Sequence, residues 1–275
     1  MSKTAMSVRT EKVHMNAYER GEHEAIVKWE KCEPSVIAQA TGFVFKPAGW
    51  LLEKIIPNKM IEAALVGFDK TADFLTDSGD VLRDGSVSKI SDLRGKDLEL
   101  SDEMANSVHN WAVGVAATEG GAAGAMGVAG MIVDIPAVVT MALRAVHKIG
   151  LCYGYEVSSP EERQFVLGIL AAAGANTMKE KNAALAVLQK IAVYVAKTTW
   201  KKMASDKTIL AAGILALKQL AKELGINLTK RKVAQIVPVV GGVVGATVNA
   251  SFLNDVAWAA RREYQKRWLM ESRQM

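Results

Sequence analysis

Three charged residues stand out because they interrupt an apolar, glycine-rich stretch, residues 111–155, in which a charge is costly unless it is paired or hydrated. Glu119 and Asp134 are carboxylates, and Arg144 is a permanent cation. Two carboxylates with an arginine are the residue types of a general acid–base site that also holds an anion. The same residues form a buried salt-bridge network if they only fix helix packing. We favour the structural role; if the chain is an enzyme, Glu119, Asp134 and Arg144 are the catalytic candidates.

Two more polar residues extend this set to candidates for ligand binding. His147 follows Arg144 by three positions, and Tyr153 lies at the end of the stretch. Asp134-Ile135-Pro136 has the residue types of a helix N-cap and first turn. A helix that begins there places Arg144 almost three turns away, so Arg144 must pair with Glu119 or with a ligand. The predicted ligand-binding residues are Glu119, Asp134, Arg144, His147 and Tyr153.

The signatures of common enzyme and metal sites are absent from the sequence. The four histidines are scattered, with no HExxH motif, so we predict no metal site. No GxSxG, Walker A or dinucleotide-binding motif occurs, and we predict no cofactor. The two cysteines, Cys32 and Cys152, form no CxxC motif and fit a reducing compartment. Cys152 is expected to be a buried thiol.

Apolar residues recur at helical spacing along most of the chain, and no strand pattern is evident. In the central stretch, Gly120, Gly124, Gly127 and Gly130 lie on one stripe that permits close helix packing. Because glycine weakens a helix by about 1 kcal/mol relative to alanine, tight packing or an apolar surround must compensate. The sequence therefore predicts an all-α fold, a multi-helix bundle with glycine-rich central helices.

Capping residues indicate where individual helices begin and end. Ser159-Pro160 predicts a helix start, and Gly154 is the expected left-handed residue after the preceding helix. Residues 77–95 have the composition of a linker or surface loop. We predict a flexible N-terminal arm, residues 1–16, and a single helical domain, residues 17–275. Within that domain, further helices are expected at 18–32, 58–76, 182–203 and 207–224, and from 233 onward.

The C-terminal third combines a weakly apolar segment, residues 236–253, with flanking cations and tryptophans. Such cations attract anionic head groups, and tryptophan side chains prefer the head-group level. The alternative is that this segment is the core helix of a soluble bundle. The chain has a net charge of +5, no nucleic-acid-binding motif and no secretory signal pattern, so we expect an anionic membrane surface or lipid as partner and no nucleic acid. The predicted membrane-binding residues are Lys230, Arg231, Lys232, Trp258, Arg261, Arg262 and Trp268.

Three segments resemble the EcsC family over roughly residues 25–262. AATEGGAAGAMGVAGMIVDIPAVVTMALRAVHKIGLCYGYEVSSPEERQFVL is similar to the core motif of the family. KIIPNKMIEAALVGF is similar to its N-terminal segment, and LGINLTKRKVAQIVPVVGGVVGATVNA to its C-terminal segment. The positions that match the core motif are Glu119, Gly120, Asp134, Pro136, Arg144, Tyr153 and Gly154.

The family takes its name from a bacterial operon that also encodes an ABC transporter. The resemblance therefore implies a bacterial protein at the cytoplasmic face of the inner membrane, and it implies little about mechanism. A protease activity is sometimes attributed to the family, but the chain contains no protease motif.

We therefore expect a non-enzymatic helical protein that associates peripherally with the membrane and binds a lipid or another apolar ligand between its helices. The alternatives are a hydrolase or other enzyme that uses Glu119, Asp134 and Arg144, or an accessory partner of an ABC transporter. A large apolar pocket beside Arg144 would favour ligand binding. A solvent-reachable carboxylate pair near a nucleophile would favour an enzyme.

Overall fold

The computed structural model contains eight helices and no strand among the residues that it describes, so the predicted all-α bundle is confirmed. The predicted helix at 58–76, nearly all of the helix at 207–224 and residues 1–14 of the predicted arm lie outside the described residues. The described residues are 15–35, 78–125, 127–157, 159–197, 223, 227–228, 231 and 238–273.

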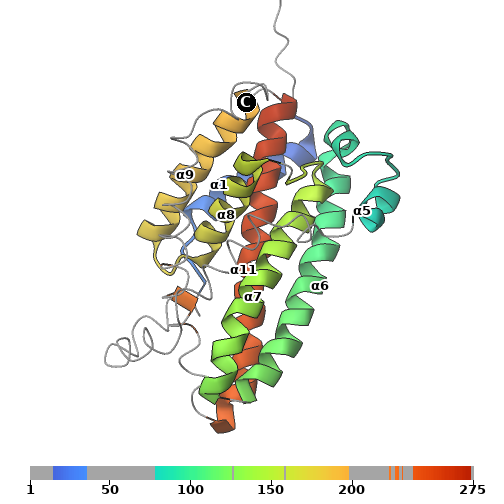
Figure 1. Cartoon of the computed structure of the whole chain (residues 1–275). Helices are drawn as coiled ribbons and strands as arrows, with labels where there is room; N and C mark the ends of the chain where they lie inside the picture. Colours follow the sequence, from blue (N-terminus) through green and yellow to red (C-terminus); the bar gives the residue numbers. More distant parts are fainter. Residues whose placement is uncertain are drawn as a thin grey trace, which may run out of the picture.

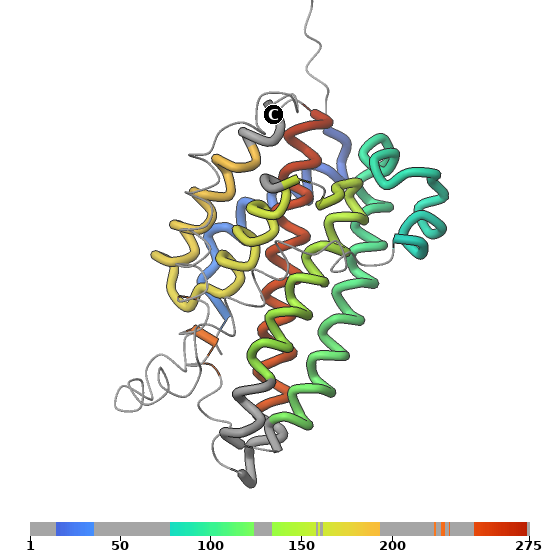
Figure 2. Tube along the Cα trace, in the orientation of Figure 1, coloured from blue at the N-terminus to red at the C-terminus, as the bar shows by residue number. Residues whose placement is uncertain are grey.

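The central helix of the bundle is α11, Pro238–Arg273, which with 36 residues is also the longest described helix (Figure 1). The α6–α7 hairpin, Leu98–Ala125 and Gly127–Cys152, packs along one side of α11 (Figure 2). Gly120 permits this contact, because a Cβ there would lie 2.5 Å from the carbonyl oxygen of Gly245 on α11. The predicted close packing of a glycine-rich helix is therefore confirmed at this position.

Three further helices lie on the other side of α11 (Figure 1). α1, Ala17–Lys31, and α8, Pro160–Gly174, pack against α11, and α9, Met178–Lys197, packs against α8. α1 begins with a capping box, in which Asn16 accepts a hydrogen bond from the backbone N–H of Glu19 and the Glu19 carboxylate accepts one in return. The helix predicted at 18–32 is confirmed within one residue at each end.

The predicted caps on either side of residues 153–159 are confirmed. Gly154 has a φ of 84°, and the Tyr155 N–H donates to the Gly150 carbonyl at 2.9 Å, which is the long hydrogen bond of a Schellman motif. A Cβ at Gly154 would lie 2.8 Å from the backbone nitrogen of Arg94, so both conformation and space require glycine. Ser159 accepts a hydrogen bond from the Glu162 N–H and caps α8.

The interpretation of residues 77–95 as a linker or surface loop is wrong. This segment forms a short helix, α5, Gly79–Asp84, and a 3₁₀ helix, η2, Ile90–Gly95. Val81, Ile90 and Leu93 are buried in the core. The segment is rich in Asp, Ser and Gly, which suggested a loop. Its three apolar residues are widely spaced, but their packing into the core outweighs the turn-like composition of the segment.

The prediction that Asp134 caps a new helix is also wrong. α7 begins at Gly127 and continues through Pro136. A proline inside a helix leaves one carbonyl without its N–H donor and costs about 3 kcal/mol, so packing must compensate. Asp134 contributes to that packing: its carboxylate accepts a 2.8 Å hydrogen bond from Asn249 on α11, and both residues are buried.

Several polar and charged side chains of α11 are paired with residues of neighbouring helices. Arg267 forms two 2.7 Å hydrogen bonds to Glu162 of α8, and both side chains are less than 10% exposed. Arg273 holds Glu19 of α1 in the same two-bond arrangement. Gln265 donates to Asp102 of α6. These contacts fix the position of α11 relative to three helices, because a buried charge without its partner is strongly unfavourable.

One described segment, Asp134–Cys152, has the length and composition of a membrane span. Within the bundle, 67% of that segment is buried, and the core helix of a soluble protein has the same character. The described part of the weakly apolar 236–253 segment does not reach this composition.

The first prediction concerns the Arg267–Glu162 pair. Glu162→Gln should lower the free energy of unfolding by about 3 kcal/mol, because it leaves a buried guanidinium with less than its full charge compensation. The matched control is Glu30→Gln, which removes a partner of Lys266 whose side chain is 28% exposed and should cost less than about 1 kcal/mol. Urea denaturation followed by circular dichroism measures both. Equal losses in the two variants would contradict the importance of the buried pair.

Candidate functional site

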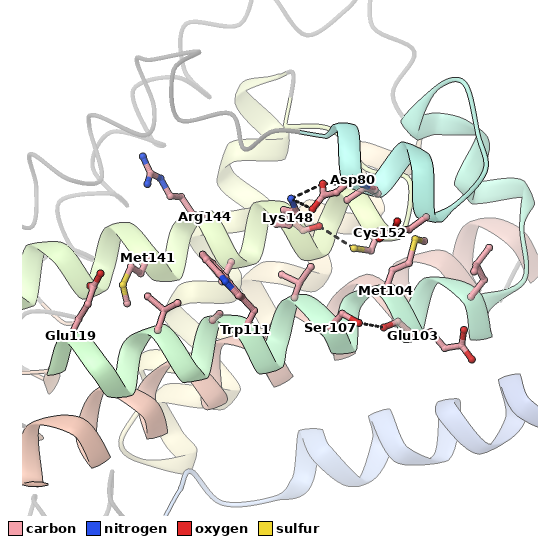
Figure 3. A pocket seen from close by; sticks show the side chains of 17 residues that line it. Asp80, Glu103, Met104, Ser107, Trp111, Glu119, Met141, Arg144, Lys148 and Cys152 are labelled. Atoms are coloured by element: carbon pink, nitrogen blue, oxygen red, sulfur yellow. Dashed lines mark hydrogen bonds and ion pairs between the residues drawn. The ribbon is translucent and has the colours of Figure 1, made fainter. Parts of the chain in front are cut away.

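A groove of about 880 Å³ lies between α5, α6 and α7 (Figure 3). Its walls are mostly apolar, and polar side chains lie among them. The principal apolar residues are Leu100, Met104, Val108, Trp111, Val115 and Met141. The charged lining residues are Asp80, Asp84, Glu103, Glu119, Arg144 and Lys148.

The groove follows from side-chain size along the α6–α7 hairpin. Ala112 and Ala145 are small residues at its lining, and they leave space that the longer side chains around them border. Figure 3 shows Glu119 beside Met141 at one end, and Met104 beside Cys152 at the other. The groove therefore runs along the two helices, and a ligand in it lies roughly parallel to them.

An ion pair joins α5 to α7 at the Cys152 end of the groove. The Lys148 ammonium lies 2.7 Å and 2.5 Å from the two carboxylate oxygens of Asp80. Partial burial pushes the pKa of the Asp80 carboxyl up, but the hydrogen bond and charge of Lys148 outweigh it, and the pKa is lowered. Asp80 is therefore ionised at neutral pH and holds α5 against the groove.

Arg144 lies one helical turn before Lys148 and lines the same groove. Figure 3 shows its guanidinium extending away from α6. Its side chain is exposed, as is that of Glu119, so the expected buried salt-bridge network of Glu119, Asp134 and Arg144 does not form. Asp134 lines no part of the groove and is bound to Asn249 instead. The reason is the longer α7, which places Asp134 at the contact with α11 rather than at a helix end.

The other two predicted ligand-binding residues belong to the packed interior. His147 is 2% exposed, and burial followed by the charge of Lys148 lowers its pKa to about 4, so the ring is neutral at physiological pH. Tyr153 is buried and donates a short hydrogen bond to Asp102. Of the five residues predicted to bind a ligand, the structure brings Glu119 and Arg144 to the groove. No measurement tests ligand binding by any of them, and the set remains a prediction.

Most of the predicted membrane-binding residues contact protein groups. Arg231 is 1% exposed and pairs with Asp255 at 3.0 Å, and Trp268 is also buried. Arg262 pairs with Glu22, and Arg261 donates to Asn106 while lying over the ring of Trp258. Lys230 and Lys232 lie outside the described residues. A role of this set at a membrane stays a prediction.

Three of the lining residues that the sequence did not predict are Asp80, Lys148 and Trp111. Asp80 belongs to a segment with loop composition, and nothing local pairs it with a lysine 68 positions later. Lys148 had a usable signal, because it follows Arg144 by four positions and so shares its helix face. Trp111 is 70% exposed on α6, which is unusual for a large apolar side chain.

The groove lacks an activated nucleophile among the described residues that line it. Cys152 is buried, and burial raises the pKa of its thiol to about 12; its Sγ donates to the Lys148 carbonyl at 3.3 Å. In the described part of the chain, no three His, Cys, Asp or Glu side chains are arranged to hold a metal ion. The arrangement can therefore bind an elongated apolar group and charged atoms beside it.

Glu263 is a buried carboxylate away from the groove, on α11. It is 4% exposed, and its Oε1 has no hydrogen-bond partner among the described residues. Burial raises the pKa of Glu263 to about 7; the charges of Lys266 and Lys181 oppose the shift, and that of Glu30 adds to it. Because Glu263 lines no part of the groove, we assign it no ligand and expect an effect on stability alone.

The second prediction follows from that pKa. Between the ordinary glutamate value of 4.5 and pH 7, native Glu263 keeps a proton that the unfolded chain has lost, so stability falls as pH rises through this window. Relative to the parent protein, Glu263→Gln should gain up to about 3 kcal/mol in unfolding free energy between pH 4.5 and about pH 8. Urea denaturation at several pH values measures this. The exposed control Glu156→Gln should follow the parent curve, and the same behaviour in Glu263→Gln would refute the assignment.

Comparison with known proteins identifies the family to which this chain belongs. The chain matches the model of the EcsC protein family over residues 21–269. It is 26% identical over 262 residues to YdbA, an uncharacterized protein of Bacillus subtilis (strain 168), and the match covers 90% of this chain and 91% of YdbA. No solved structure matches the chain. The resemblance found in the sequence is thus confirmed, and the chain belongs to the EcsC protein family.

Proposed function

We propose that this protein is a non-enzymatic lipid-binding protein at the cytoplasmic face of a membrane, and that the lipid lies in the groove between α5, α6 and α7. The observation that carries the proposal is the groove itself, which is largely apolar and opens beside Arg144. Its volume of about 880 Å³ falls within the range of about 300–1,000 Å³ that is usual for small-molecule sites. A pocket of this kind is the feature that favours ligand binding over catalysis.

The groove suits a molecule with an apolar chain and a charged head. Met104, Val108, Val115 and Met141 supply apolar contacts along the two helices. Lys148 and Asp80 supply charges at one end, close to the partly buried α5 contact. A purely apolar ligand would remove water from this ion pair and offer it no hydrogen bonds in return, so an amphiphile fits better.

Trp111 supports contact with the bilayer. It is exposed, it lines the groove, and an amphipathic indole side chain favours the head-group level of a membrane. A lipid can pass between bilayer and groove without crossing bulk water if this face of α6 lies on the membrane. We therefore place the membrane-facing surface at Trp111, and the cations predicted around 236–253 are a second, independent expectation.

The two alternatives, an enzyme and an accessory partner of an ABC transporter, receive less support. An enzyme that uses Glu119, Asp134 and Arg144 together requires them at one site, and Asp134 is bound at the α11 contact. Partnership with an ABC transporter stays a prediction, for which no surface of the described residues gives a specific argument.

The third prediction tests lipid binding through Trp111. Trp111→Ser should weaken flotation with vesicles of mixed phosphatidylethanolamine and phosphatidylglycerol roughly tenfold, because burying a large apolar side chain contributes about 1.5–3 kcal/mol. Native mass spectrometry of the parent protein should also detect bound lipid, and Ala145→Phe, which fills the groove, should remove it.

The matched control is Val187→Ser on α9. Val187 is the other large apolar residue that is exposed among the described residues, at 54%, and it does not line the groove. This variant should float as the parent does. Equal loss in both variants would indicate nonspecific apolar adhesion, and a parent protein that stays at the bottom of the gradient without bound lipid would overturn the proposed function.

A further inference from the structure

The charges around the groove are sorted by helix. α7 contributes the two cations, Arg144 and Lys148, which are four residues apart and share a helix face. α5 contributes two carboxylates, Asp80 and Asp84, which have the same spacing. Figure 3 shows Asp80 and Lys148 facing each other across the end of the groove. Lys148 is thus bound to Asp80, and Arg144 and Asp84 each lie one helical turn away from this pair, on α7 and α5, where the head of an amphiphile would bind.

Among the described residues, the groove is lined by more acidic than basic groups. Four carboxylates and two cations of the described residues line it, since Glu103 and Glu119 of α6 add to the two carboxylates of α5. An anionic head group that binds Lys148 competes with Asp80, whose oxygens both lie within 2.7 Å of that ammonium. It also brings a third negative charge next to Asp80 and Asp84, which is unfavourable in a partly desolvated site.

A head group that carries both charges avoids this cost. Its anionic group can take the place of Asp80 at Lys148, while its cationic group takes the place of Lys148 at Asp80. Every charge of the original ion pair then keeps an opposite charge next to it. A primary ammonium also donates three hydrogen bonds, which suits the two carboxylates of α5, whereas a quaternary ammonium donates none.

We propose, on the basis of the proposed lipid-binding function, that the groove takes a zwitterionic phospholipid whose head group bears a phosphate and a primary ammonium, as phosphatidylethanolamine does. The phosphate binds between Arg144 and Lys148, and the ammonium binds Asp80 and Asp84. The acyl chains extend along α6 and α7 past Val108 and Trp111 toward Met141.

The test compares three short-chain lipids below their micelle concentration, with equal acyl chains: dihexanoyl phosphatidylethanolamine, phosphatidylglycerol and phosphatidylcholine. The full-length protein is titrated with each, and binding is measured by calorimetry and tryptophan fluorescence. The ethanolamine lipid should bind at least about tenfold more tightly than the glycerol lipid, because two displaced charges are compensated rather than one. The choline lipid should bind with intermediate affinity.

Asp84→Asn tests the part of the site that binds the ammonium separately from the part that binds the phosphate. Asp84 is more than half exposed and pairs only weakly with Arg83, so the variant should fold normally. It should bind the ethanolamine lipid several-fold more weakly and the glycerol lipid no more weakly than the parent does, which lowers the ratio of the two affinities. Lys148→Gln should weaken both. The control Glu156→Gln should leave all three affinities unchanged.

The outcomes distinguish this inference from the proposed function. Binding of the glycerol lipid as tightly as the ethanolamine lipid, or an unchanged affinity ratio in Asp84→Asn, would overturn the zwitterionic specificity and leave lipid binding intact. Failure of all three lipids to bind would overturn the proposed function as well.

Discussion

The fold depends on the need to neutralise the charges that α11 carries into the centre of the bundle. Arg267 and Arg231 are almost fully buried on or beside this helix, and each is bound to a carboxylate. Asp102 of α6 accepts hydrogen bonds from Tyr18, Tyr153 and Gln265, so α1, the turn that follows α7, and α11 meet at one buried carboxylate. A sliding or rotated α11 would leave several of these groups unpaired at once, and each would cost several kcal/mol. The arrangement of the helices around α11 is therefore specified by charge as well as by apolar packing.

This arrangement determines where a ligand site can form. The α6–α7 hairpin directs its glycine-rich and polar contacts, such as Gly120 and Asp134, toward α11. α5 lies on another side of the hairpin and is tied to α7 by the Asp80–Lys148 pair. Among the described residues, the groove is the space along the hairpin that this six-residue helix does not fill.

Local signals in the sequence predicted local structure well, and failed where partners are distant. Gly154, Ser159 and the ends of α1 follow from residues within a few positions, and the structure confirms them. Asp134 has the residue context of an N-cap, but its true partner, Asn249, is 115 positions away. The Asp80–Lys148 pair likewise cannot be predicted from the sequence, because the two residues are 68 positions apart. Glu119 and Arg144 were singled out because charge is costly in an apolar stretch. Both line the groove, but their side chains are exposed, so the buried network that this argument favoured does not form.

Net charge is a poor guide to the ligand of such a protein, and the reason is visible in how the cations are used. The chain as a whole is basic, with a net charge of +5, which taken alone predicts an anionic partner. Yet Arg231, Arg262, Arg267 and Arg273 are bound to carboxylates inside the fold and contribute little field at the groove. Among the described residues, the groove is lined by four carboxylates and two cations. Since electrostatic selection acts through the groups nearest the ligand, this local arrangement, rather than the net charge, is the basis on which we propose a head group that carries both signs.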